Sequence, residues 1–169
     1  MQRPILTRLL LTFTLAAVTA QAAPSFQKIT VTKEFLCEGA DVGDFNKDGK
    51  MDIAAGPYWW AGPDFTVKHE YAPPAAQPYD GAKSYSDYFL TYTHDFNGDG
   101  WMDILVYSWP GKAVCWYENP QNRGGHWFRH AIMAEGDGES PDIGDMNGDG
   151  KPELLAFSGG RLGFAELDW

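Results

Sequence analysis

A loop rich in aspartate, asparagine and glycine occurs three times in this chain of 169 residues and constrains its fold more than any other feature. The three copies align without gaps as GDFNKDGKMDIAAG, HDFNGDGWMDILVY and GDMNGDGKPELLAF, at residues 43–56, 94–107 and 144–157. Their first aspartates are 51 and then 50 residues apart: Asp44, Asp95 and Asp145. Self-similarity at a fixed period of this length indicates a protein built from repeated structural units.

Short strands are predicted around each loop. The apolar run after each copy, at 53–55, 104–106 and 154–156, is too short for a helix and is typical of a buried strand. Aromatic segments and strands with basic or polar residues follow, and 88–92 adds a strand before the second loop. Four short strands in about 50 residues make one β-propeller blade. We therefore predict an all-β fold with blades of four antiparallel strands.

About three blades are expected, near residues 35–71, 85–133 and 139–169 of a repeat region at 23–169. Residues 24–34 resemble the outer strand of a blade and are a candidate ring-closing strand. The segment 72–86 is rich in proline and alanine, which predicts an insertion between blades. Because propellers have four to eight blades, we expect an incomplete propeller whose further blades come from a longer protein or another chain.

The first 22 residues have the layout of a secretory signal peptide. Arg3 and Arg8 precede an apolar run at 9–18, and Ala20-Gln21-Ala22 forms a cleavage site near Ala22/Ala23. The run is about half of the ~20 residues that span a bilayer, so we expect cleavage and a secreted or periplasmic protein without a membrane span. A formal charge of −10 argues against a nucleic-acid partner.

The loops carry the pattern D-x-N-x-D-G-x-x-[DE], which predicts three Ca²⁺ sites. Positions 1, 3, 5 and 9 offer hard oxygen donors, position 6 is a glycine that permits the bend, and position 7 offers a main-chain oxygen. An EF-hand is excluded because its position 12 is a glutamate, and here that position is apolar. Plain Asx-turns without metal are the alternative. The candidate ligands are Asp44, Asn46, Asp48, Lys50, Asp52, Asp95, Asn97, Asp99, Trp101, Asp103, Asp145, Asn147, Asp149, Lys151 and Glu153.

The loops, the apolar run after each and the spacing resemble the FG-GAP/VCBS repeats of integrin-α-like β-propellers. The stretches GPYWW, SDYF, WYENP and GHWFRH are similar to secreted bacterial members of that family. The resemblance implies that the loop side chains bind Ca²⁺ between two strands of a blade. One position departs from the pattern, because His94 stands where the other copies have Gly43 and Gly144.

No catalytic motif stands out, and the two cysteines, Cys37 and Cys115, are expected either to pair or to stay as free thiols. We therefore expect a non-enzymatic, calcium-stabilised binding or adhesion module with an unidentified protein or glycan ligand. A scaffold domain of a longer protein and part of a carbohydrate-active enzyme are the alternatives. Trp101, at loop position 7, is expected to point outward and contact ligand, whereas Trp116 and Tyr117 are expected to wedge blades together.

Overall fold

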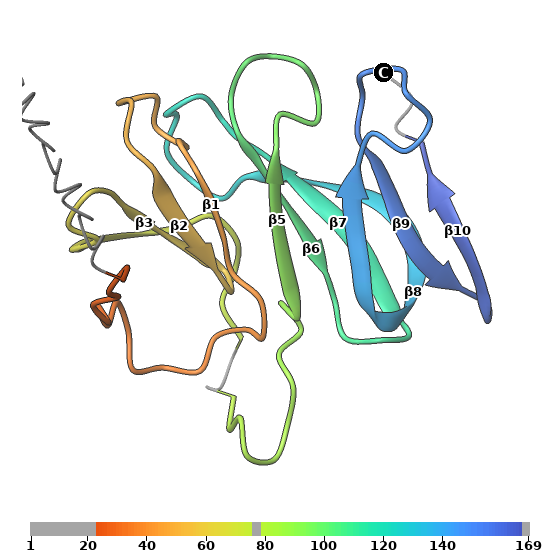
Figure 1. Cartoon of the computed structure of the whole chain (residues 1–169), viewed down its shortest axis with the longest axis horizontal. Helices are drawn as coiled ribbons and strands as arrows, with labels where there is room; N and C mark the ends of the chain where they lie inside the picture. Colours follow the sequence, from red (N-terminus) through yellow and green to blue (C-terminus); the bar gives the residue numbers. More distant parts are fainter. Residues whose placement is uncertain (1–22, 76–78, 167–169) are drawn as a thin grey trace, which may run out of the picture.

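The computed structural model of the chain describes residues 23–75 and 79–166 and is built from antiparallel β-sheets (Figure 1). The predicted all-β fold is confirmed, since this part of the chain contains no helix. It accordingly provides no helix that could cross a membrane. The predicted signal peptide at 1–22 lies outside the described residues.

Ten strands form two sheets. The four-stranded sheet has the order β1-β2-β3-β4: β1 (Asp41–Gly43), β2 (Asp52–Ala55), β3 (Tyr58–Ala61) and β4 (Val67–Glu70). The six-stranded sheet has the order β10-β9-β8-β7-β6-β5: β5 (Leu90–His94), β6 (Asp103–Tyr107), β7 (Lys112–Glu118), β8 (Phe128–Gly144), β9 (Glu153–Ser158) and β10 (Arg161–Ala165). Every pairing joins neighbours in the chain, as expected for a meander of local hairpins.

The strands fall into three repeat units, each with one of the loops between its first two strands. Unit 1 is β1–β4, unit 2 is β5–β7 with the first part of β8, and unit 3 is the second part of β8 with β9 and β10. A single strand of 17 residues thus belongs to two units. It pairs with β7 from Phe128 to Gly136 and with β9 from Asp137 to Gly144. The sequence predicts two separate blades here, near 85–133 and 139–169, whereas the continuous strand β8 joins units 2 and 3 into one sheet.

Two clusters of buried side chains hold the units together. The first lies between units 1 and 2 and joins Phe45, Ala54 and Trp59 of unit 1 to Ile104 and Val106 of unit 2. The second lies between units 2 and 3 and contains Phe96, Leu105, Tyr107, Val114, Leu154 and Ala156. The residues alternate along the strands, so each strand sends one set of side chains to each neighbouring unit.

The segments outside the units differ in how they are held. Residues 24–34 form no strand with any described residue, and Phe26 is 97% exposed. Within the predicted insertion, Ser86 is buried, and its hydroxyl donates a hydrogen bond of 2.7 Å to the carbonyl oxygen of Leu36. Both cysteines are free thiols, Cys37 half-buried and Cys115 buried.

Candidate functional site

The three loops occupy the same place in their units. They connect β1 to β2, β5 to β6 and β8 to β9, at residues 44–52, 95–103 and 145–153, and are called loops 1, 2 and 3. The flanking strands pair in the same register, with Gly43 opposite Asp52 in loop 1. The other two pairs are His94 with Asp103 and Gly144 with Glu153. His94 stands where the other two units have glycine, and its ring packs on that of Phe96 at 5.5 Å between centroids.

Positions 1, 3 and 5 come together in every loop. In loop 1 the N–H of Asp48 donates to Asn46 Oδ1 at 2.9 Å and to Asp44 Oδ1 at 3.1 Å. The corresponding bonds are 3.0 and 3.0 Å from Asp99 to Asn97 and Asp95, and 2.8 and 3.1 Å from Asp149 to Asn147 and Asp145. The position-6 glycines adopt the left-handed conformation that the bend requires: Gly49 (φ 81°), Gly100 (φ 83°) and Gly150 (φ 86°).

The position-9 carboxylate is buried at the base of each loop. Asp52 Oδ2 accepts the N–H of Phe45 at 2.9 Å, and Asp103 Oδ2 accepts that of Phe96 at 2.9 Å. Glu153 is one methylene longer, and its Oε2 accepts the N–H of Met146 at 2.7 Å. The position-9 acid therefore ties the end of each loop back to position 2.

A second backbone donor reaches the first two of these carboxylates from the far end of the unit. Asp52 Oδ1 accepts the N–H of Gly62, just after β3, at 2.9 Å. Asp103 Oδ1 accepts the N–H of Asn119, just after β7, at 2.8 Å. Asp103 forms no ion pair with a described residue, although it is fully buried. Each carboxylate thus links its loop to the third strand of its own unit.

The buried position-9 carboxylates of loops 1 and 2 have raised pKa values. Burial raises the pKa of Asp103 to about 7, and the nearby carboxylates of Asp99 and Asp95 contribute. Burial likewise raises the pKa of Asp52, with a contribution from Asp48 and Asp44. A bound cation would relieve both effects, since positive charge within a few ångströms favours the ionised carboxylate.

The donor chemistry of the loops fits Ca²⁺. Positions 1, 3, 5 and 9 contribute carboxylate and amide oxygens, which hard cations prefer, and no sulfur or imidazole donor belongs to the pattern. Among the described residues, no three acidic, histidine or cysteine side chains form a metal cluster by themselves.

The residue at position 7 makes the same main-chain hydrogen bond in all three loops, but its side chain is a tryptophan in loop 2 and a lysine in loops 1 and 3. The N–H groups of Lys50, Trp101 and Lys151 donate to the position-5 aspartates of their loops at 2.9, 2.8 and 2.8 Å. Trp101 is half-buried, and the Nζ of Lys47 in loop 1 lies 4.5 Å from the centroid of its ring. The side chain contacts the neighbouring loop through this cation–π interaction. The contact of Trp101 with a ligand stays a prediction.

The segment after β7 contributes residues that the sequence did not single out. Asn122 Nδ2 donates to the carbonyl oxygen of Asn46 in loop 1 at 3.0 Å, and Gln121 Nε2 donates to Asp99 Oδ2 in loop 2 at 2.9 Å. Asn119 is buried below them. This segment overlaps the WYENP stretch at 116–120, but its contacts with two loops depend on the packing of units 1 and 2.

The predicted wedge residues lie in the core. Tyr117 is buried in the cluster between units 1 and 2, and Trp116 packs against the cluster between units 2 and 3. The ring of Trp116 stacks on His130 at 4.1 Å between centroids, and Trp59 stacks on His69 at 3.9 Å. These rings therefore serve interior packing, which confirms the wedge interpretation for this pair.

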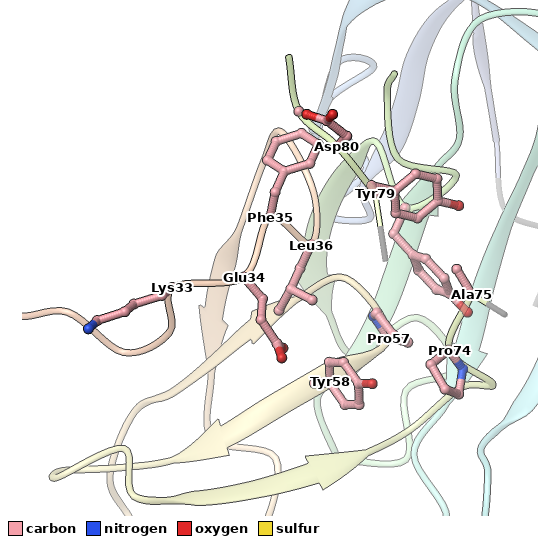
Figure 2. Close-up of a pocket in the computed structure, with 12 residues that line it drawn as sticks. Lys33, Glu34, Phe35, Leu36, Pro57, Tyr58, Pro74, Ala75, Tyr79 and Asp80 are labelled. Atoms are coloured by element: carbon pink, nitrogen blue, oxygen red, sulfur yellow. The ribbon is translucent and has the colours of Figure 1, made fainter. Parts of the chain in front are cut away.

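A cavity of about 670 Å³ lies beside unit 1, lined by residues 33–36, Pro57, Tyr58 and parts of 74–88. Figure 2 shows Glu34 directed toward Tyr58, whereas Lys33 points away from the cavity. Tyr79 lies on the opposite wall, near Ala75 and Pro74. Burial raises the pKa of Tyr58, and the carboxylates of Glu70 and Glu34 add to this effect. Rings beside carboxylates can stack on and hydrogen-bond to a polar ligand.

Comparison with known families identifies part of this arrangement. The family described as FG-GAP-like repeat matches residues 95–156, which begin at loop 2 and continue past loop 3 into β9. No curated protein matches the chain. Loop 1 lies before the matched range and has the same hydrogen bonds among positions 1, 3 and 5 as loops 2 and 3.

Proposed function

We propose that this chain, whose residues 95–156 match the FG-GAP-like repeat family, is an exported β-propeller-type interaction module whose three loops bind Ca²⁺. The observation that carries the proposal is the repetition of one hydrogen-bond arrangement in loops 1, 2 and 3. The oxygen-bearing side chains at positions 1, 3, 5 and 9 recur at the same spacing in all three loops, although several other loop residues differ. The signal-peptide pattern at 1–22 supports export, and extracellular Ca²⁺ modules function at 10⁻⁴–10⁻³ M dissociation constants.

Calcium has a structural role in this proposal. The side chains at positions 1, 3, 5 and 9 and the main chain at position 7 would hold the ion. When bound, Ca²⁺ supplies the positive charge that neutralises the carboxylates of each loop. The carboxylates of Asp52 and Asp103 already link loops 1 and 2 to the third strands of their units. A bound ion in either loop would therefore rigidify the whole unit.

Units 1, 2 and 3 correspond in this proposal to three propeller blades. Units 1 and 2 each have four strands, and unit 3 has three among the described residues. The buried clusters between consecutive units match the packing of neighbouring blades around an axis.

The proposal that this protein binds a ligand rests on the cavity beside unit 1. Its walls combine the rings of Phe35, Tyr58 and Tyr79 with the carboxylates of Glu34 and Asp80. This mixture suits a glycan, whose apolar ring faces stack on aromatic side chains while its hydroxyls donate to carboxylates. Trp101 is a second candidate contact that does not line this cavity; Lys47 lies over its ring, as Lys68 lies over the ring of Tyr58.

Calcium titration by isothermal calorimetry tests the metal assignment. We expect three sites in the purified protein and two in a D95N/D99N variant, which neutralises loop 2. Glu139→Gln changes an exposed acid outside the loops and is the matched control, for which three sites are expected. If calcium injected into the protein releases no more heat than calcium injected into buffer, the loops are plain Asx-turns without metal.

Binding to a panel of soluble glycans tests the ligand assignment separately. We expect a glycan whose binding weakens at least tenfold in Tyr58→Ala and is unchanged in Phe128→Ala, an exposed ring on β8. Calcium binding without any glycan binding would favour the scaffold alternative. Turnover of a glycan would favour the enzyme.

A further inference from the structure

The strand after each loop buries one of its faces against the following unit. In unit 1 the residues of this face are Phe45 at loop position 2, Ala54 in the centre of β2, and Trp59 opposite it on β3. In unit 2 the same positions hold Phe96, Leu105 and Trp116. Unit 2 covers the first set and unit 3 covers the second, so the contact repeats from unit to unit.

Unit 3 presents the same face without a cover among the described residues. Its equivalent positions hold Met146, Leu155 and Phe164, and Phe157 and Leu162 lie next to them. Phe164 is 53% exposed and Leu162 is 61% exposed. These five residues are called the open face. Large apolar side chains gathered on one sheet face commonly mark an interaction surface.

The edge of unit 3 is also incomplete. In units 1 and 2 a fourth strand pairs with the third, placing His69 opposite Trp59 and His130 opposite Trp116. Within residues 23–75 and 79–166, β10 pairs with β9 alone, and no strand lies along its outer edge. Phe164 occupies the position of the two tryptophans, and no described residue stacks on its ring. An unpaired edge offers backbone donors and acceptors to an added strand.

The N-terminal segment has the composition of the missing strand. Residues 26–31 have the sequence FQKITV, and the fourth strand of unit 2 begins FRHAIM at 128–133. Both begin with phenylalanine, have a base at the third position and continue with apolar or β-branched residues. The segment is described by the structure but pairs with nothing there, and Ile29 is 70% exposed.

We propose that the N-terminal segment of a second copy of this chain adds to the outer edge of β10 as the fourth strand of unit 3, beside the open face. The added strand would bond through its main chain, as in other cases of strand addition. In this arrangement Lys28, at the position of His130, is the residue suited to lie against Phe164. A reciprocal exchange between two copies gives an assembly with two-fold symmetry.

The structure favours a second copy over the segment of the same chain. Figure 1 shows the N-terminal segment beside unit 1, at the opposite end of the molecule from β10. The residues that follow it are anchored there, because the N–H groups of Glu38 and Gly39 donate to the carbonyl oxygen of Phe89 at 3.0 and 2.9 Å. A second copy brings its segment to β10 without breaking these bonds.

The mass of the purified protein in millimolar calcium, measured by light scattering after gel filtration, tests the proposal. We expect twice the mass of one chain. Phe164→Lys places a second positive charge against Lys28 of the added strand, and Ile29→Pro removes a backbone donor from the segment, so both are expected to halve the mass. The controls Phe128→Lys, at a ring 68% exposed on β8, and Ile29→Ala are expected to keep the doubled mass.

Hydrogen exchange of the β10 amides decides whether a dimer uses this edge. We expect these amides to exchange at least tenfold more slowly in the wild type than in Ile29→Pro, whose substitution lies in an unpaired segment and leaves the fold intact. A single-chain mass for the wild type overturns the proposal. A dimer that persists in both disruptive variants, or β10 amides that exchange equally fast in both proteins, also overturns it.

Discussion

The side chain of Asn119 joins two repeat units. Its Nδ2 donates to the carbonyl oxygen of Phe45 in loop 1 at 2.9 Å, across 74 residues of sequence, and also to that of Met102 at 2.9 Å. Its own N–H donates to Asp103. One buried side chain therefore holds loop 1, the end of loop 2 and the end of β7 in a fixed arrangement.

Replacing this residue tests how much the link contributes. We expect Asn119→Ala to destabilise the protein by about 2–4 kcal/mol, because it leaves two carbonyl oxygens, those of Phe45 and Met102, without their donor. Urea unfolding followed by tryptophan fluorescence measures the loss. Asn122→Ala removes one exposed bond and is expected to cost under about 1 kcal/mol. Equal losses in the two variants would contradict the link.

Calcium is expected to raise the melting temperature. At tenfold excess over the dissociation constant each site adds roughly 1.4 kcal/mol, so three sites add about 4 kcal/mol. For a chain of this size that corresponds to a rise of about 8–16 °C. Scanning calorimetry in millimolar calcium and in excess chelator measures it. The same concentration of magnesium is the control, since Mg²⁺ demands octahedral geometry and dehydrates reluctantly. Equal melting temperatures in calcium and in chelator would contradict the metal assignment.

The packing between units 2 and 3 depends on Phe96. Its ring is buried in the cluster with Leu105 and Leu154, and Phe96→Ala is expected to cost about 3–5 kcal/mol through lost burial and the cavity left behind. Phe128→Ala removes an exposed ring and is expected to cost under about 1 kcal/mol. Chemical denaturation of the two variants under identical conditions compares them. A small loss for Phe96 would show that unit 3 does not pack on unit 2 as described.

Thiol reactivity should depend steeply on pH. Burial raises the pKa of Cys37 to about 11 from 9.0, so at pH 8 the folded protein holds about 100-fold less of its reactive thiolate than an unperturbed thiol does. Alkylation by iodoacetamide is therefore expected to be slow at pH 8 and to accelerate as the pH rises toward 11. The Cys115→Ala variant isolates Cys37, and the same variant unfolded in urea is the fast-reacting control. Equal alkylation rates of Cys37 in the folded and the unfolded protein at pH 8 would contradict the burial of this thiol.

The sequence by itself determined the loops, the repeat and the class of fold. Apolar runs of three residues after each loop are too short for helices and are typical of buried strands, and a period of about 50 residues indicates repeated structural units. These features are local, because the Asx-turns of positions 1–5 and the left-handed glycine at position 6 form within a few residues of one another. The packing of Trp116 and Tyr117 was also predictable, since each lies in a repeated strand.

Only the tertiary structure decided the long-range features. The continuity of β8, the pairing of Asp103 with the N–H of Asn119 and the contact of Lys47 with Trp101 all depend on how the units pack. The exposure of Phe164, where Trp59 and Trp116 are covered, depends on which neighbour each unit has. Such contacts join residues that are distant in the chain, and no local pattern encodes the register that brings them together.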